Sequence, residues 1–173
     1  MENLPLQSAK DYILEAFFIL LKTKPIDKIT IIEICEKAGV SRVTFYKYFK
    51  TKTDIIETYF KASELFFKNQ ITDIDFSDEE TLKNIATMTL KDLKNNKDKM
   101  TALIDNNMEH VYLEIINNAI LNSFKAPISH EDKIIACIYS GALYNLAIMW
   151  VKNDCQESID EIIRGLVRSL KII

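Results

Sequence analysis

Apolar residues recur at helical spacing along most of the chain. Residues at i, i+3, i+4 and i+7 lie on one face of an α-helix, so this pattern predicts amphipathic helices. The first predicted helix begins after Ser8 and ends before Pro25, and residues 71–78 are predicted as a loop. Eight more helices are predicted at about 30–38, 41–49, 51–70, 78–95, 97–106, 108–124, 130–153 and 157–172.

Capping residues mark several of these helix boundaries. Thr30 with Glu33 forms a capping box, in which the hydroxyl accepts a free backbone N–H and the glutamate reaches back to residue 30. Ser8 with Asp11 can cap the first helix in a similar way. Gly39 follows the short second helix, where glycine favours a left-handed backbone. The chain therefore makes a tight turn at residues 39–40.

The composition excludes several fold classes. The 173 residues contain only three Gly and three Pro, too few for the turns that sheets need. This shortage argues against β-sandwiches, β-barrels and Gly-rich nucleotide-binding folds. With 48% hydrophobic and 27% charged residues, the chain is typical of a globular protein. We therefore predict an all-α protein of one or two small domains.

Charge is unevenly distributed. The chain has a net charge of −3, but residues 1–54 hold nine Lys or Arg against seven Asp or Glu, a net of +2. Residues 37–52 contain five bases and no acid. A basic patch on an otherwise acidic protein is compatible with nucleic-acid contact confined to one end.

Two features concern the cellular compartment. The three cysteines form no CxxC pair and the N-terminus resembles no signal peptide, which together predict a cytoplasmic protein. Residues 134–151 carry no charge over 18 positions, close to the length of a membrane span. Ser140, Gly141 and Asn145 dilute this hydrophobicity. A helix buried on most sides is therefore favoured over a membrane span.

The chain begins with one longer predicted helix, followed by two short helices that a tight turn joins. This is the layout of a helix-turn-helix. At 100° per residue, four residues of the second short helix fall within an arc of about 140°: Arg42, Val43, Tyr46 and Lys47. Phe45 and Tyr48 fall on the other side, toward the preceding helices. Arg can bond to guanine edges, whereas Tyr and Lys suit phosphates.

The segment 29–52 resembles the DNA-binding segment of the tetracycline-repressor (TetR) family. It contains a Thr-capped helix, an Ala-Gly-Val turn and the sequence Ser-x-x-Thr-hydrophobic-Tyr-x-x-Phe-x-x-Lys. The resemblance implies an all-α fold of about nine helices. Residues 1–54 would form a three-helix DNA-binding domain, and 55–173 a helical bundle for ligand binding and dimerisation.

The resemblance also implies roles for single residues. Gly39 would make the turn. The residues facing the groove would be Arg42, Val43 and Lys47, and those holding phosphates would be Thr44, Tyr46 and Lys52. Lys52 lies in the first turn of a helix, whose free N–H groups already favour a phosphate. Two positions depart from the family pattern: Tyr48 stands where His is frequent, and Ile31 and Ile32 stand where some members place a polar base-contacting residue.

The last two predicted helices are candidates for a dimer interface, since their apolar stripes need a partner. The candidate interface residues are Ile138, Leu143, Leu146, Trp150, Ile159, Ile163, Leu166 and Leu170. The alternative is that these helices pack within one monomer.

An effector cavity in the C-terminal bundle is implied by the family, and Met and aromatic side chains adapt to irregular apolar ligands. The candidate lining residues are Phe60, Phe67, Met88, Met100, Leu103, Met108, Tyr112 and Tyr144. Glu64, Glu109 and His110 are candidates to meet a cation or polar group, or else lie on a solvated face.

We therefore predict a homodimeric repressor that binds a palindromic double-stranded DNA operator and is released by a small-molecule effector. The resemblance is also compatible with activation by a bound partner, or with loss of any ligand response. The alternative function is an all-α interaction or membrane-associated adaptor without DNA binding. With two histidines, no HExxH pair, no phosphate loop and no GxSxG motif, we predict no enzymatic activity, no cofactor and no metal site.

Overall fold

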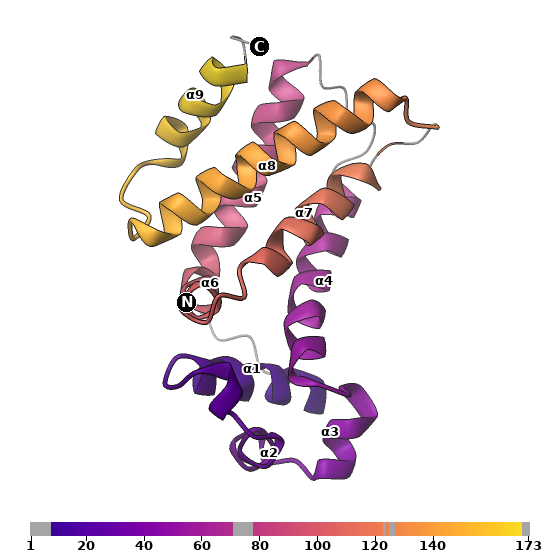
Figure 1. Ribbon diagram of the computed structural model, residues 1–173, viewed down its shortest axis with the longest axis vertical. Coiled ribbons are helices and arrows are strands. Elements are labelled where there is room, and N and C mark those ends of the chain that lie inside the picture. Colours follow the sequence, from indigo (N-terminus) through magenta and orange to yellow (C-terminus); the bar gives the residue numbers. More distant parts are fainter. Residues whose placement is uncertain (1–7, 71–77, 123, 125–126, 171–173) are drawn as a thin grey trace. The chain divides into compact units, whose positions relative to one another are not determined.

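A computed structural model of the chain describes residues 8–70, 78–122, 124 and 127–170, with only the backbone described for 62–70 and 170. Backbone contacts divide the chain into two compact units, Met1–Tyr59 and Phe60–Ile173. All regular structure in the described part is helical, which confirms the predicted all-α class (Figure 1). The boundary between the units falls inside one helix, α4 (Lys52–Gln70).

The first unit contains three helices and the start of α4: α1 (Ala9–Leu21), α2 (Ile31–Ala38) and α3 (Arg42–Tyr48). A 3-10 turn, η1 (Ile26–Lys28), connects α1 to α2. The helix α1 packs against both α2 and α3 (Figure 1). The core of the first unit is rich in aromatic rings. Four of its phenylalanines are buried: Phe17, Phe18, Phe45 and Phe49.

The predicted caps of this unit are present. The Thr30 hydroxyl accepts from the N–H of Glu33 at 3.2 Å, and the Glu33 carboxylate accepts from the N–H of Thr30 at 2.9 Å. Gly39 has φ 67° and ψ 31°, the left-handed conformation expected for a glycine that ends a helix. The capping box and the glycine together fix both ends of α2, and hence the angle at which α3 follows.

The helices of the second unit that follow α4 are α5 (Glu79–Asn95), α6 (Lys97–Asp105), α7 (His110–Leu121), α8 (His130–Lys152) and α9 (Ile159–Leu170). The unit is built around the long helix α8, which contacts α5, α6, α7 and α9. The helix α5 also packs against α9 (Figure 1).

Polar side chains hold α8 in register with its neighbours. The hydroxyl of Tyr139 donates to the carbonyl oxygen of Leu82 on α5 at 2.6 Å, and Ser140 donates to the side-chain oxygen of Asn117 on α7. At the other end, the indole N–H of Trp150 donates to the carbonyl oxygen of Glu157 at 2.9 Å. Buried polar groups that are paired in this way select one alignment of the packed helices.

The helix α8 is also the one helix in the described chain that could span a membrane by length and composition. Its most apolar 18-residue window has a mean hydropathy of 1.7, and 44% of that window is buried inside the unit. A core helix of a globular protein passes the same test, so this finding is weak evidence for a membrane span.

The helix predictions agree with the structure to within a few residues. The largest difference is in α7, which ends at Leu121 rather than at about residue 124. The predicted loop at 71–78 lies outside the described residues except for Asp78, which caps α5. Side-chain carboxylate bonds to the N–H groups of Glu80 and Thr81 show why that helix begins where it does.

Candidate nucleic-acid interface

The helix α3 separates its side chains into a buried and an exposed set. Phe45 is fully buried in the first unit. The exposed set contains Arg42, Val43, Tyr46 and Lys47, the residues that the helical arc places together. Val43 is 82% exposed, the largest exposed fraction among the large hydrophobic side chains that are described. One face of α3 thus offers a guanidinium, an ammonium, a phenol and an isopropyl group to a partner.

The short helix α3 is stabilised by a side-chain cap at its N-terminus and by an aromatic contact. The Ser41 hydroxyl accepts from the N–H of Thr44 at 3.0 Å, and the two hydroxyls lie 2.9 Å apart. The ring of Phe45 packs edge-on to Tyr46, with 5.5 Å between centroids. Because Thr44 is engaged with the cap, its hydroxyl also has a structural role besides the predicted phosphate contact.

Tyr48 does not point inward as the helical arc predicts. It is 39% exposed, and the ammonium of Lys47 lies 5.6 Å from the centroid of its ring. At 100° per residue Tyr48 is displaced by about 60° from Phe45, which places it at the edge of the buried face. Tyr48 therefore adds a second exposed phenol to α3, which sequence reasoning missed.

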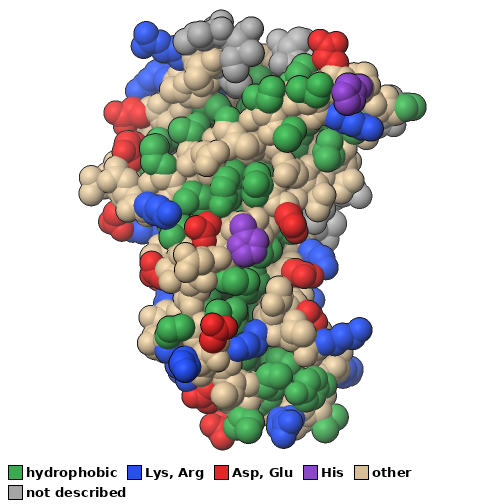
Figure 2. Space-filling model, in the orientation of Figure 1, with side chains coloured by type: hydrophobic (Ala, Val, Ile, Leu, Met, Phe, Trp, Pro, Cys, Tyr) green, Lys and Arg blue, Asp and Glu red, His purple; other side chains and the backbone are tan. Residues whose placement is uncertain are grey.

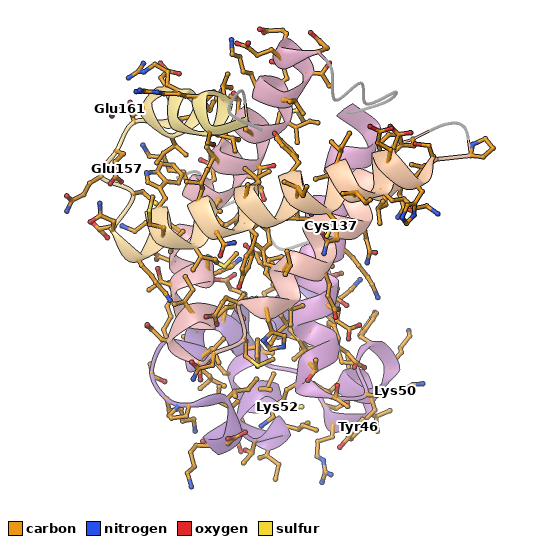
Figure 3. The ribbon with its side chains drawn as sticks, turned by 45° about the horizontal axis from the view of Figure 1, so that its top comes forward. Tyr46, Lys50, Lys52, Cys137, Glu157 and Glu161 are labelled. Carbon is orange, nitrogen blue, oxygen red and sulfur yellow. The ribbon has the colours of Figure 1, made fainter. Side chains whose placement is uncertain are left out.

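Lys52 has a structural contact that the sequence did not predict. Its ammonium donates to the carbonyl oxygens of Ile26 at 2.6 Å and Ile29 at 2.8 Å. In Figure 3 Tyr46 and Lys50 lie at the edge of the ribbon, whereas Lys52 lies among the helices of the unit. An ammonium has three donors, so one donor is left for a phosphate. Lys52 thus ties the start of α4 to the segment that precedes α2.

Two carboxylates order the turns that flank the helix-turn-helix. Glu33 pairs with Lys24 at 2.5 Å, and this bond, together with bonds from Thr30, lowers the pKa of Glu33 to about 2. Asp54 accepts from the hydroxyl of Thr51 at 2.6 Å and from the N–H of Lys50 at 2.8 Å, which lowers its pKa. Both groups are ionised at neutral pH and hold α2 and α4 at their first turns.

The second unit exposes a different kind of surface, along α8 (Figure 2). Four large apolar side chains of this helix are exposed, and we call them the α8 apolar face: Ile134, Ile135, Ile138 and Met149. Cys137 is exposed on the same helix (Figure 3). A shallow groove of about 500 Å³ continues along α8, lined by Asn145, Ile148, Met149, Lys152 and Asn153.

The structure places the eight predicted dimer residues in different environments. Ile138 belongs to the α8 apolar face, and Leu146 and Ile159 are half-buried. Four are buried inside the unit, where they already have partners: Leu143, Trp150, Ile163 and Leu166. The apolar stripe of α9 packs on α5, so it is a core stripe of the unit. The side chain of Leu170 lies outside the described residues.

The predicted effector residues gather in the second unit. Phe60, Met100, Leu103 and Tyr112 are buried, and the rings of Phe60 and Tyr112 lie 5.3 Å apart. The half-buried members are Met88, Met108 and Tyr144. Phe67 and Glu64 lie outside the described side chains, and His110 is exposed, with Nδ1 3.2 Å from the carbonyl oxygen of Asn107.

Two polar atoms in this region are buried without a hydrogen-bond partner: the hydroxyl of Tyr112 and Oε2 of Glu109. Burial raises the pKa of Tyr112, and burial together with the charge of Glu109 raises the pKa of Tyr144. A buried polar atom that lacks a partner costs about 1–3 kcal/mol. The sequence offered Glu109 as a polar candidate but gave no sign of the Tyr112 hydroxyl. In the part of the chain that the structure describes, no group of three metal-ligating side chains is found.

Two sequence models of known families cover most of the chain. Residues 13–59 match the bacterial regulatory proteins of the tetR family, and residues 80–171, more than half of the chain, match a transcriptional regulator C-terminal region. The chain belongs to the TetR family of transcriptional regulators. Its first unit is the DNA-binding helix-turn-helix domain of that family.

Solved structures of other regulators share this fold. The dihydroxyacetone kinase operon activator DhaS is 20% identical with a TM-score of 0.64, over 95% of this chain and 97% of that one. FadR from Bacillus subtilis, solved with stearoyl-CoA, is 18% identical with a TM-score of 0.61, over 91% and 95%. A regulator from Aquifex aeolicus VF5 is 23% identical with a TM-score of 0.62, over 95% and 99%. No curated protein sequence gives a significant match.

Proposed function

We propose that this protein is a cytoplasmic homodimeric repressor that binds a palindromic operator and is released by a small-molecule effector. The observation that carries the proposal is the exposed face of α3, where Arg42 and Lys47 flank apolar and phenolic groups on a capped helix. Arg42, Val43 and Lys47 would face the groove, and Thr44, Tyr46 and Lys52 would hold the phosphates.

The dimer follows from the geometry of operator recognition. A helix-turn-helix module reads one half-site, and two half-sites lie about 34 Å or a multiple of it apart. The α8 apolar face supplies a surface that a second copy would cover, because its aliphatic side chains are exposed to water in a single chain. We assign the two-fold contact to this face, with Ile138 at its centre and Leu146 beside it.

The effector would bind among the buried residues around Phe60 and Tyr112. Phe60, Met100 and Leu103 offer an apolar wall. Glu109 can only accept a hydrogen bond when ionised, and the Tyr112 hydroxyl can donate or accept. A ligand with an apolar body and an amine, amide or hydroxyl group would satisfy both atoms. FadR from Bacillus subtilis was solved with stearoyl-CoA, whose acyl chain is apolar, and this supports a ligand with an apolar body for the present chain.

Release from DNA would be a population shift. The effector lowers operator affinity only by its preference for the non-binding state of the dimer over the binding state. The same reasoning allows an effector that favours DNA binding, so the direction of regulation is set by which state the ligand prefers.

The test is selection of genomic fragments by the purified full-length protein at moderate ionic strength. The expected result is a palindrome bound at least 1,000-fold more tightly than random DNA. Equal affinity for all DNA and for other polyanions would contradict the proposal. A Tyr112→Phe variant should bind this operator as the wild type does. An identified effector should release the variant less readily, because one of its hydrogen bonds is lost.

A further inference from the structure

The helix-turn-helix exposes several large apolar groups, most of them on α3, where the charged side chains are basic. Four of the ten large hydrophobic side chains that are exposed in the described residues lie between positions 32 and 48: Ile32, Val43, Tyr46 and Tyr48. The exposed bases of the same segment are Lys37, Arg42 and Lys47, and Glu36 is its exposed acid. Figure 2 shows hydrophobic and basic side chains side by side on the first unit.

Val43 is the most exposed of these side chains, and of all the large hydrophobic residues that are described outside the core. It is the second residue of α3, directly after Arg42. The first residues of a recognition helix are those that contact base edges in the major groove. An isopropyl group can bond neither to a phosphate nor to a donor or acceptor of a base. Its contribution to binding must therefore come from apolar contact.

The major groove offers one apolar group, the C5-methyl group of thymine. The structure assigns Val43 as the residue that selects a thymine in the operator half-site, by packing against this methyl group. This inference rests on the proposed function and specifies part of the sequence that α3 reads. Neighbouring Cα atoms are 3.8 Å apart, close to the 3.4 Å rise of one base pair. The thymine should thus lie within about two base pairs of the guanine that Arg42 contacts.

The first experiment selects operators from a random duplex library with the full-length protein. The expected half-site has a guanine whose replacement is not tolerated by wild type but is tolerated by Arg42→Ala. It also has a thymine within about two base pairs of that guanine.

The second experiment replaces each thymine of one half-site in turn by deoxyuridine, which removes the methyl group and leaves every hydrogen-bonding group in place. At the thymine assigned to Val43, wild-type affinity should fall about fourfold, the fold-change for one buried methyl group at about 0.8 kcal/mol. The same replacement should change the affinity of Val43→Ala by less than about twofold. Ile19→Ala, an exposed apolar residue on α1, should keep the full wild-type penalty.

The outcomes separate the inference from the proposed function. If the selection yields an operator but no thymine is sensitive to deoxyuridine, Val43 does not read a methyl group and the inference fails while DNA binding stands. The inference also fails if Val43→Ala keeps the wild-type penalty at every thymine. If no sequence is selected over random DNA, the proposed function itself fails. Folding is not at issue, because truncating a side chain that is 82% exposed leaves the core intact.

Discussion

Both α3 and α8 expose apolar side chains, but the residues around those side chains differ. On α3, Val43 and Tyr46 lie beside Arg42 and Lys47, and Lys50 follows just after the helix; all five side chains are exposed. On α8, the apolar face lies within residues 134–151, which contain no charged residue. A surface that mixes bases and apolar groups matches a polyanion with apolar groups in its groove, whereas an uncharged surface matches another apolar surface.

This difference shows that exposure of apolar groups alone does not identify a partner. The two faces differ in the charged residues beside their apolar groups: the α3 face has bases, and the α8 apolar face has none. Binding through α3 should therefore weaken steeply with salt as counterions are released, while contact through α8 should be largely insensitive to salt.

The largest effect is expected from charge placed on the α8 apolar face. Ile134→Glu combined with Ile138→Glu should give monomers, because two carboxylates would be buried at the proposed interface. Operator affinity should then fall by about 100-fold or more through loss of the second half-site. Light scattering and operator titration measure the two effects. Tyr12→Glu on α1 is a matched control, since Tyr12 and Ile138 are both 47% exposed. A double variant that stays dimeric would place the interface elsewhere.

A smaller effect is expected on the α3 face. Arg42→Ala should weaken binding to the selected operator by roughly 1–3 kcal/mol and relax the preference at one base position, through loss of a forked contact to guanine. The variant should remain dimeric, because Arg42 lies outside the α8 face. Titrations with the operator, its point variants and random DNA measure the result. An equal loss for specific and random DNA would show that Arg42 contacts a phosphate.

Replacing Lys52 distinguishes its contribution to the stability of the first unit from its predicted contact with a DNA phosphate. Lys52→Met removes the bonds to Ile26 and Ile29, so the first unit should lose about 1–2 kcal/mol of unfolding free energy. If the remaining donor also meets a phosphate, the slope of log affinity against log salt should fall by about one. Lys50→Met, which removes an exposed ammonium nearby, is the control for stability. A change in slope with unchanged stability would make Lys52 a phosphate contact alone.

The smallest effect concerns acid. The folded pKa of Glu33 is about 2 and its ordinary value is 4.5, so its ionised form stabilises the fold above pH 4.5. This contribution is lost as the pH falls from 4.5 toward 2. Glu33→Gln should lower the melting temperature by a few degrees at pH 7, and the gap should close near pH 2. Thermal unfolding across this range measures it, with Glu36→Gln on the same helix as control. A gap that stays constant with pH would mean that the charge of Glu33 does not matter.

Local features of this protein were predictable from its sequence. The Thr30–Glu33 capping box, the left-handed Gly39 and the outward set on α3 depend on residues within five positions of each other, so local spacing rules are enough to predict them. The resemblance of segment 29–52 to the TetR family then identified the first unit, and the family comparison confirms it.

Features that depend on distant residues were not predictable. Lys52 bonds to carbonyl oxygens 26 and 23 positions away, which no spacing rule detects. Helical periodicity also does not distinguish a stripe that packs inside a monomer from one that packs between monomers. Ile163 and Leu166, two of the predicted interface residues, are core residues of the unit, so replacing them by alanine would open a cavity and destabilise it.

The bonds from Lys52 have a mechanical consequence. Because its ammonium holds the carbonyl oxygens of Ile26 and Ile29, the first turn of α4 is fastened to the connection between α1 and α2. Tilting that turn independently would break two charge-assisted bonds. If α4 bends when the protein changes conformation, we expect the bend after its first turn. The segment from α1 to Lys52 should then move as one rigid body.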